Sequence, residues 1–521
     1  MGYKPLPVRQ LAIICACRFA EPICFTVIFP FVIFMIRDFN IADETHVGYY
    51  VGMITSAFAV AQLMTGILWG MLSDRIGRRP VILLGLTGTL TSIILFGLSR
   101  SFAWAIISRS LCGVLNGNIG VLKSMVSEIT LENAPDQRAR AFSMLPLMYG
   151  LGSIVGPVLG GLLSHPVKNY PSLFGRGGPL TDFLTEFPYF LPCFISGCIC
   201  AVGLIFGIFY LEETLGGTAS SSTTSKSKNS ETAPLLRSDS HHSDEYNTFD
   251  RSPSPTPTIT DDTRKHDHDD KKKPSLRESL TPAVLGICFS YALFAFQAIY
   301  YDELFPIWTA SERSNGGLGY RSDEIGIALA YCGVVTLVVQ LFVLPAMTKR
   351  FGLLRLFRFV LCGCVVLYFF QGFIRYLYDI PDIHGHTGTK TWVWVGLIIA
   401  VTFKTLFHST AFTSCTILTN NCAPRLDALG AINGFAQCCA SGMRAFGPAS
   451  CGIIWSASLG ATWIPYPIRV HISWVCLTLV GALTFYTSSR LNPQDYDLAK
   501  FIPAEDEVEQ PENEDQLNHR A

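Results

Sequence analysis

Long apolar runs separated by short polar segments dominate the chain. A run of about 20 apolar residues is long enough for a helix to cross the hydrocarbon core of a bilayer. Such runs fall into two groups of six, on either side of a long polar segment. Their approximate ranges are 11–36, 48–72, 80–98, 102–126, 141–164 and 188–211, then 282–308, 325–347, 353–377, 392–419, 428–459 and 468–488. The pattern predicts an all-α membrane protein with twelve transmembrane helices in two six-helix halves.

The polar segments predict which parts of the chain lie outside the membrane. The central one is rich in Ser, Thr, Asp, Lys and Pro and has too little apolar surface to bury, so we expect a disordered linker. The expected domains are an N-terminal segment 1–10, a first half 11–211, a linker 212–281, a second half 282–488 and an acidic tail 489–521.

Basic residues predict the orientation, because Lys and Arg next to a membrane gather on its cytosolic side. Arg75, Arg78 and Arg79 fall on the same side of the twelve predicted spans as the cluster Lys271–Lys273 and the two tails. We therefore expect both termini and the linker to be cytosolic. The membrane itself stays open between the plasma membrane and the vacuolar membrane.

The composition excludes several function classes. With 49% hydrophobic and 15% charged residues in 521, the chain is too apolar for a soluble protein of this size. Nothing in it indicates enzyme chemistry or a nucleic-acid-binding surface. The 17 cysteines lie mostly inside apolar runs, where they act as small buried side chains, and no zinc-ligand spacing occurs. The tract His266–Asp270 is better explained as a solvated charge run than as a metal site. We expect no cofactor and no metal.

The stretch Gly70–Pro80 places four charged residues between two predicted spans. Asp74 is followed by three arginines, and Pro80 suits the first turn of a new helix. The pattern predicts that a transmembrane helix ends at Leu72 and that a very short cytosolic loop follows.

Charged residues inside the spans are candidates for function, because a charge at the bilayer centre costs about 2.5–3.5 kcal/mol on insertion scales. Arg18 and Glu21 share one face of the first helix. A buried carboxyl titrates closer to neutral pH, which makes Glu21 a candidate proton carrier. The alternative is a structural ion pair of Glu21 with Arg18 or Arg109.

Polar residues in three other spans, the fourth, the seventh and the tenth, complete the candidate set. The seventh offers Gln297, Tyr300, Tyr301, Asp302 and Glu303. Arg109, Gly113, Asn116, Gly120 and Lys123 form one stripe if the fourth span is a continuous helix. Lys404 either binds an anionic group of a substrate or pairs with a carboxylate. His408 either titrates near neutral pH or is a hydrogen-bonded packing residue.

Three motifs resemble the major facilitator superfamily, and the resemblance covers nearly all of the chain outside the linker and tails. The first is the signature between helices two and three, matched at Gly70, Asp74, Arg75, Gly77, Arg78 and Arg79. The second begins at Arg109 in helix four, where Cys112 stands in place of the usual Gln. The third is similar to the helix-five motif of drug:H+ antiporters, with Gly152, Gly156, Pro157, Gly160 and Gly161. Asp302–Trp308, Thr419–Asn421 and Gly430–Gly434 resemble the zinc-induced-facilitator-like branch of plants and fungi.

The resemblance implies the major facilitator fold, with two pseudo-symmetric halves around a central cavity lined by helices one, four, seven and ten. It implies proton coupling through Arg109, which joins Glu21 as a candidate, and a gating role for the Gly70–Arg79 motif. In that fold a central substrate cavity holds Arg18, Asn116, Gln297, Tyr301, Lys404 and His408. Asp74 would hold the cytosolic side shut by contacting a helix N-terminus of the opposite half.

The function implied is proton-coupled export of a small organic molecule, such as a drug, a toxin or a secondary metabolite. The expected partners are that small-molecule substrate, protons and the lipid bilayer, and we expect a monomer that binds no nucleic acid. Two alternatives stay open. One is uptake or facilitated transport of a nutrient, an organic acid or a metal chelate, and the other is a membrane receptor that has lost transport.

Overall fold

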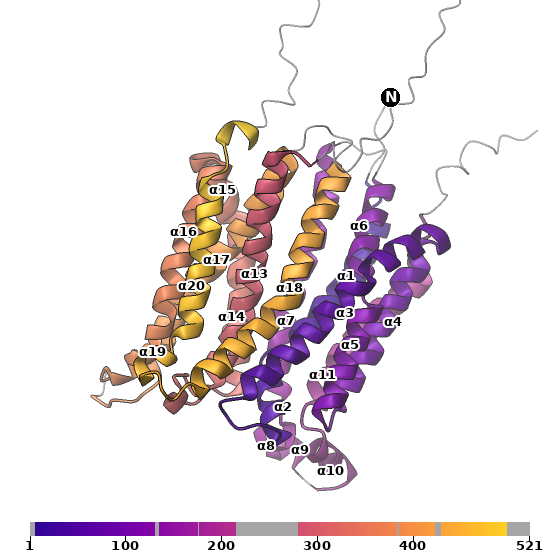
Figure 1. Ribbon diagram of the computed structural model, residues 1–521. Helices are drawn as coiled ribbons and strands as arrows, with labels where there is room; N and C mark the ends of the chain where they lie inside the picture. Colours follow the sequence, from indigo (N-terminus) through magenta and orange to yellow (C-terminus); the bar gives the residue numbers. More distant parts are fainter. Residues whose placement is uncertain are drawn as a thin grey trace, which may run out of the picture. The chain divides into compact units, whose positions relative to one another are not determined.

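The computed structural model shows helices joined by turns, with no strand in the part of the chain that it describes (Figure 1). The described residues are 6–130, 135–175, 177–214, 280–382, 385–422 and 429–496. The predicted linker is described only at its two edges, so its boundaries at 212 and 281 stay predictions.

The first half contains the first six expected spans and a set of short connecting helices. Its helices are α1 (Val8–Thr26), α2 (Val32–Asp38), α3 (Val47–Ile76), α4 (Arg78–Gly97), α5 (Phe102–Leu115), α6 (Asn118–Ile129), α7 (Pro135–Leu163), α8 (Pro166–Asn169), α9 (Pro171–Phe174), α10 (Pro179–Glu186) and α11 (Phe190–Tyr210).

The second half repeats this plan with one internal irregularity. Its helices are α13 (Pro282–Ala310), α14 (Ser322–Val338), α15 (Leu344–Phe351), α16 (Leu353–Gln371), α17 (Thr391–Asn421), α18 (Leu429–Gly460), α19 (Tyr466–Arg469) and α20 (Ile472–Ser489). A π-helical turn, Val339–Val343, joins α14 to α15 just before Pro345. Because proline cannot donate to the preceding turn, a local widening of the helix there is expected.

Nine of the described helical segments are long and apolar enough to cross a membrane. The other three expected spans correspond to α1 with α2, to α7, which has a shorter apolar stretch Leu147–Leu163, and to α18. All three contact the opposite half or the buried charges described below. These three spans are less apolar than the other nine because protein, rather than lipid, covers much of their surface.

Two expected continuous spans are interrupted. The first span breaks between α1 and α2, at a turn that contains Pro30. The fourth breaks at Asn116 and Gly117, where a Cβ atom on Gly117 would lie 2.2 Å from the side chain of Trp69. Trp69 also donates to the carbonyl of Val114 at 2.6 Å, which satisfies a carbonyl that the break leaves free. The prediction of one stripe from Arg109 to Lys123 was therefore wrong.

The helix end predicted at Leu72 was also wrong. Helix α3 continues to Ile76, α4 begins at Arg78, and Gly77 alone forms the turn with a φ of +104°. A glycine is required there because this φ is unfavourable for residues with a Cβ atom. The charges at Asp74 and Arg75 mark the edge of the apolar run rather than the end of the helix.

The two halves meet along two long helix pairs, α3 with α18 and α7 with α14. Within the first half α1 packs on α7 and α11, and α4 packs on α5 and α11. Within the second half α13 packs on α18 and α20, and α16 packs on α17 and α20. This arrangement places the charged residues of α1, α5 and α13 in the interior of the bundle.

Candidate functional site

Close glycine contacts seal one end of the interface between the halves. On α3, a Cβ atom on Gly52 would lie 2.4 Å from the carbonyl oxygen of Pro448 on α18. A Cβ atom on Gly452 would lie 2.2 Å from the carbonyl oxygen of Gly48. The second pair behaves alike, since a Cβ on Gly161 of α7 would be 2.7 Å from the Cα of Gly326 on α14. Small residues let these backbones touch. We call the end of α3 that starts at Val47 the closed end.

Hydrogen bonds between the halves accompany these contacts. The backbone N–H of Tyr49 donates to Ser456 at 3.0 Å, and that of Ala449 donates to Ser56 at 2.8 Å. Thr55 donates to the carboxylate of Glu303 at 3.2 Å. Two further bonds, between Ser164 and Ser322 at 2.8 Å and from Arg37 to the carbonyl of Ala310 at 3.1 Å, lie near the same end. The closed end is therefore held by short polar side chains as well as by packing.

The other end of the same interface is open. On α3, Cβ atoms on Gly66 and Gly70 would meet nothing within 4 Å, and the same holds for Gly434 and Gly442 on α18. The two helices that touch at Gly52 and Pro448 thus separate toward the end that carries the Gly70–Arg79 motif. We call this the open end.

A three-residue polar cluster lies between α1 and the α5–α6 break. Arg18 and Glu21 form an ion pair, and Asn116 donates to the other carboxylate oxygen of Glu21 at 2.8 Å. All three side chains are buried, and the guanidinium of Arg18 lies 5.3 Å from the ring centre of Tyr149 on α7. Of the two partners that the sequence left open for Glu21, the structure selects Arg18.

Arg109 is isolated from this cluster. Its side chain is buried, and its guanidinium lies 4.9 Å from the ring centre of Phe58 and 5.7 Å from that of Phe25. In the described part of the chain, its Nε and Nη2 atoms have no hydrogen-bond partner. Aromatic faces stabilise the cation partly, but a carboxylate or a substrate oxygen would stabilise it more.

The second half has its own ion pair, between α17 and α13. Lys404 donates to Asp302 at 2.7 Å and lies 4.7 Å from the ring centre of Tyr301. His408, one turn further on, contacts the hydroxyl of Tyr368 and is buried between aromatic rings. The geometry favours pairing for Lys404 and packing for His408. Gln297 is fully buried, and both its amide atoms lack a partner among the described residues.

The glycines of the helix-five motif fit α7 closely against α1. Cβ atoms on Gly152, Gly156 and Gly160 would lie 2.5, 2.1 and 1.9 Å from Pro22, Thr26 and Val27 respectively. Gly161, as described above, faces α14 instead, and the carbonyl of Pro157 lies against Gly326. The motif thus joins the helix that bears Arg18 and Glu21 to the closed end of the interface.

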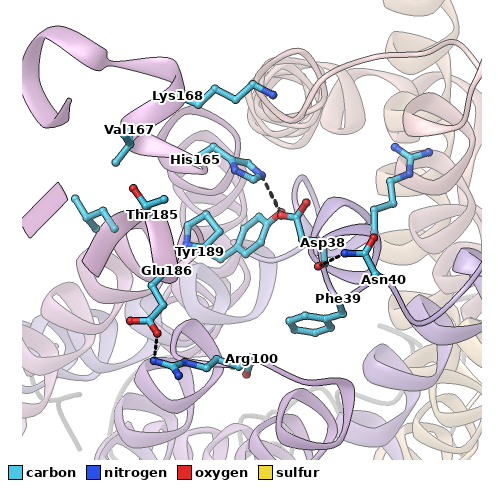
Figure 2. Close-up of a pocket in the computed structure, with 14 residues that line it drawn as sticks. Asp38, Phe39, Asn40, Arg100, His165, Val167, Lys168, Thr185, Glu186 and Tyr189 are labelled. Carbon is cyan, nitrogen blue, oxygen red and sulfur yellow. Dashed lines mark hydrogen bonds and ion pairs between the residues drawn. The ribbon is translucent and has the colours of Figure 1, made fainter. Parts of the chain in front are cut away.

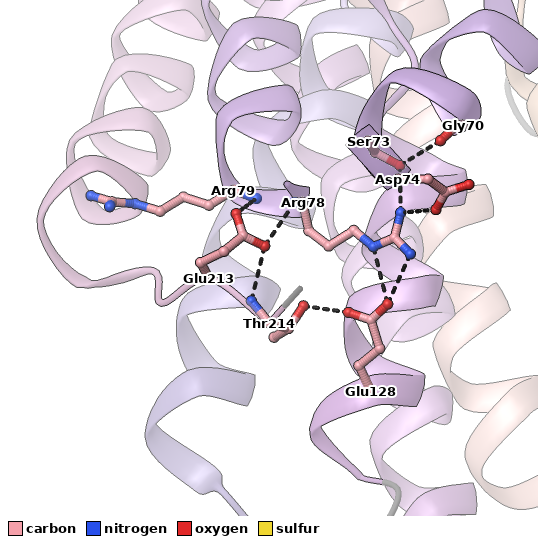
Figure 3. A network of polar contacts seen from close by, with 8 residues as sticks. All are labelled: Gly70, Ser73, Asp74, Arg78, Arg79, Glu128, Glu213 and Thr214. Carbon is pink, nitrogen blue, oxygen red and sulfur yellow. Dashed lines mark hydrogen bonds and ion pairs between the residues drawn. The ribbon is translucent and has the colours of Figure 1, made fainter. Parts of the chain in front are cut away.

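The Gly70–Arg79 motif forms a network within the first half (Figure 3). Arg78 pairs with Asp74 and, at 2.9 Å, with Glu128 at the end of α6. The backbone N–H groups of Arg78 and Arg79 donate to Glu213, at 2.8 and 3.0 Å, beyond α11. Glu213 therefore caps α4. The side chain of Asp74 is 64% exposed, and its ion pair with Arg78 is within its own half.

A polar cavity of about 630 Å³ lies beside α2, α8 and α10 (Figure 2). Tyr189 donates to Asp38, and His165 lies 2.8 Å from the hydroxyl of Tyr189 and 3.4 Å from Asp38. Burial lowers the pKa of His165, and the Asp38 carboxylate opposes that effect less strongly. Nothing in the sequence pattern indicated this cavity.

The candidate residues therefore form separate groups rather than one site. Arg18, Glu21 and Asn116 meet, and Tyr301 and Lys404 meet, whereas Arg109 contacts neither group. Residue spacing did not reveal the contact of Glu303 with Thr55, although a carboxylate inside a predicted span was a signal that pointed to Glu303.

No group of three or more metal-binding side chains occurs among the residues that the structure describes, and all 17 cysteines are free there. The tract His266–Asp270 lies outside the described residues.

Comparisons with known proteins agree with this fold. A model described as the Major Facilitator Superfamily matches residues 14–448. The chain is 34% identical over 497 residues to the multidrug transporter mfsB of Aspergillus fumigatus, covering 88% of this chain and 80% of that protein. It is 32% identical over 463 residues to the protein ZINC INDUCED FACILITATOR-LIKE 1 of Arabidopsis thaliana, covering 88% and 87%.

A solved structure gives the same picture of the fold. A bacterial homolog of the human lysosomal transporter Spinster, in an inward-facing and occupied conformation, matches with a TM-score of 0.63 at 15% identity. The match covers 96% of this chain and 100% of that one. Any function assigned to the chain must therefore be compatible with two halves whose interface is closed at one end.

Proposed function

This chain belongs to the Major Facilitator Superfamily, and on that premise we propose that it exports a small organic molecule, such as a drug, a toxin or a secondary metabolite, by antiport with protons. That it is a multi-pass membrane transporter and not an enzyme follows from the family. The substrate, the coupling ion and the direction of transport are the proposal.

The observation that carries the proposal is the Arg18–Glu21–Asn116 cluster. A buried carboxylate that is paired within the bundle can accept a proton when the pair separates. Glu21 would then alternate between a paired, ionised state and a separated, protonated state. The motif of α7 holds α1 against the closed end, so a shift of α1 and a movement of the halves are mechanically linked. Arg109, buried without a polar partner for two of its nitrogens, is the second proposed coupling residue.

We propose that the open end faces the cytosol, because the arginine-rich turn at Gly77 lies there. In this conformation the substrate would enter between the halves from the cytosol. The halves would then rock about a site near the bilayer midplane, as in transporters built from two parallel repeats. The proposed substrate contacts are Arg18, Asn116, Gln297, Tyr301, Lys404 and His408. The membrane is proposed to be the plasma membrane or the vacuolar membrane, and the protein a monomer.

The test is flux into inverted vesicles or proteoliposomes under an imposed pH gradient, with Glu21→Gln as the variant. We expect gradient-driven accumulation to fall at least tenfold in the variant, while the yield of folded protein stays unchanged. A tenfold lower concentration ratio corresponds to about 1.4 kcal/mol less free energy stored in the substrate gradient. Arg18→Gln is the matched variant, because it removes the other member of the pair. Undiminished accumulation in Glu21→Gln would remove Glu21 from the mechanism.

The alternative is uptake or facilitated transport of a nutrient, an organic acid or a metal chelate. The same vesicles separate the two. Flux that persists at the same rate after the pH gradient is collapsed would exclude proton antiport and favour facilitation. Absence of any flux with a broad metabolite mixture would favour the receptor alternative.

A further inference from the structure

Glu303 lies at the interface between the halves and accepts a hydrogen bond from the opposite half. It belongs to α13 of the second half, its residue is 2% exposed, and Thr55 on α3 of the first half donates to it at 3.2 Å. The same hydroxyl lies 3.3 Å from the carbonyl of Val51 one turn earlier. The bond is at the closed end, three residues from Gly52, whose contact with Pro448 seals that end. Opening this end must break the bond.

The carboxyl of Glu303 has no cation beside it. In the part of the chain that the structure describes, no Lys, Arg or His nitrogen lies within 4.0 Å of it, whereas Glu21 and Asp302 are both paired. The charged and titratable groups that act on it from a distance are Arg109 on α5, Asp302 on its own helix and Cys451 on α18. Glu303 is therefore the buried carboxyl that the two ion pairs leave out.

An ionised carboxylate without a cation is strongly disfavoured in such a place. A neutral carboxylic acid is not, because it keeps an acceptor oxygen for Thr55 and has an O–H group of its own to donate. Protonation of Glu303 should therefore favour closure of this end of the interface, and closure should favour protonation. When the halves separate at this end, water reaches the carboxyl and stabilises its charged form.

We propose that Glu303 is a proton-binding site, and that its protonation is the condition for closing this end of the interface. The proton comes from water on the side to which the closed end opens, and it forms an O–H bond on a carboxylate oxygen of Glu303. On reopening, that O–H bond breaks and the proton returns to water while the carboxylate keeps the electron pair. The inference rests on the proposed proton coupling and adds a pH-dependent gate on the second half, apart from the coupling residue Glu21, because the proton of Glu303 returns to the side from which it came.

The experiment measures the closed end directly. Spin labels are attached to non-canonical residues at Asp43, before α3, and at Trp463, after α18, so that the native cysteines need no replacement. In the wild type we expect the short label–label distance to dominate at low pH and the long distance to gain at least tenfold in relative population at high pH. In Glu303→Gln, which keeps the shape and is neutral at every pH, we expect the short distance at all pH values.

Two further variants sharpen the result. Thr55→Val removes the hydrogen bond between Thr55 and Glu303 without changing any charge. The short label–label distance should therefore lose population, while its pH dependence stays. Glu303→Asp keeps a titrating group and should keep the pH dependence as well. A distance distribution in Glu303→Gln that still shifts with pH as in the wild type overturns the proposal, and so does a wild-type distribution that does not respond to pH.

Transport separates this proposal from the broader one. In Glu303→Gln, gradient-driven accumulation and exchange of labelled for unlabelled substrate should both fall at least tenfold, because an end that stays shut at every pH stops alternating access. Equilibrium binding of substrate from the open end should persist. If the wild type shows no gradient-driven flux, proton antiport fails, but the pH response of the label distance still decides whether Glu303 controls closure.

Discussion

The two ends of the interface between the halves are held by different chemistry. At the closed end, glycines bring α3 and α18 into backbone contact, and neutral hydroxyl groups bond across the gap. At the open end the charges are dense, but Arg78 uses them within one half, on Asp74 and Glu128. Most of the contacts described above that join the halves at the closed end are between neutral groups, with Arg37 and Glu303 as the charged exceptions, whereas the ion pairs described above each lie within a single half.

The two kinds of contact differ in what a conformational change would cost. Contacts through glycine and hydroxyl groups can separate without leaving a buried charge unpaired, so the closed end can open at modest cost. Of the two charged exceptions at that end, Arg37 keeps its ion pair with Glu44 of its own half, whereas Glu303 has no cation beside it in the described part of the chain, so its protonation matters. At the open end the Arg78 network can survive the movement intact because every partner described for it belongs to the first half.

The largest expected effect comes from breaking the closed end at Gly52. A Cβ atom there would overlap the carbonyl of Pro448, whereas one on Gly66 of the same helix would meet open space. Overpacking costs about 1–3 kcal/mol, so Gly52→Ala should lower the population of the closed-end conformation roughly tenfold or more. Gly66→Ala should leave it unchanged. The label distances described above measure both, and equal behaviour of the two variants would contradict the assignment of a closed and an open end.

The next effect concerns the ion pairs of Arg78, which stabilise the first half at the open end. Arg78 is nearly buried and binds two carboxylates, while Arg75 on the same turn is exposed. Arg78→Gln leaves the partly exposed Glu128 without its cation, so we expect a loss of about 1.5 kcal/mol in unfolding free energy. Thermal unfolding in detergent measures it, with Arg75→Gln as the matched control. Equal stability of the two variants would show that the network does not stiffen the half.

A smaller effect is expected at Asp74, whose side chain is exposed and whose loss leaves Arg78 its bond to Glu128. Asp74→Asn should cost less than about 1 kcal/mol of stability. If Asp74 also contacts the opposite half when the open end closes, the variant should slow the transport cycle several-fold and leave substrate affinity intact. Single-turnover flux and equilibrium binding separate the two. Lost binding with a normal cycle would refute this lock.

The smallest effect is a pH dependence near the cavity at α2 and α8. Because burial lowers the pKa of His165 in the folded protein, the unfolded chain binds more protons below about pH 6.5. Stability should therefore fall as the pH drops below that value and be fully present above it. His165→Asn is the suitable variant, since His165 has a φ of +49° and asparagine tolerates that conformation. The fall in melting temperature on acidification should be smaller in the variant.

Several features could be predicted because they depend on neighbouring residues in the chain. The twelve spans follow from the lengths of the apolar runs, and the family follows from Gly70–Arg79 and Gly152–Gly161. Helix ends were harder to predict. Asp74 and Arg75 are polar yet helical, because the chain leaves the apolar layer before its helix ends.

The partners of the charged residues were decided only by the tertiary structure. Arg18 and Arg109 were both candidates for Glu21, and the structure pairs Glu21 with Arg18 and leaves Arg109 beside Phe25 and Phe58. The cavity at His165 and Asp38 joins segments that no local pattern connects.

Hydropathy and motif spacing, which are local properties of the chain, were enough to predict an all-α membrane protein of this family. Only the tertiary structure decided which end of the interface is closed and which carboxyl is left without a cation. The contact of Thr55 with Glu303 joins residues 248 positions apart. No periodicity encodes such a contact, because it depends on how closely two separately formed halves approach one another.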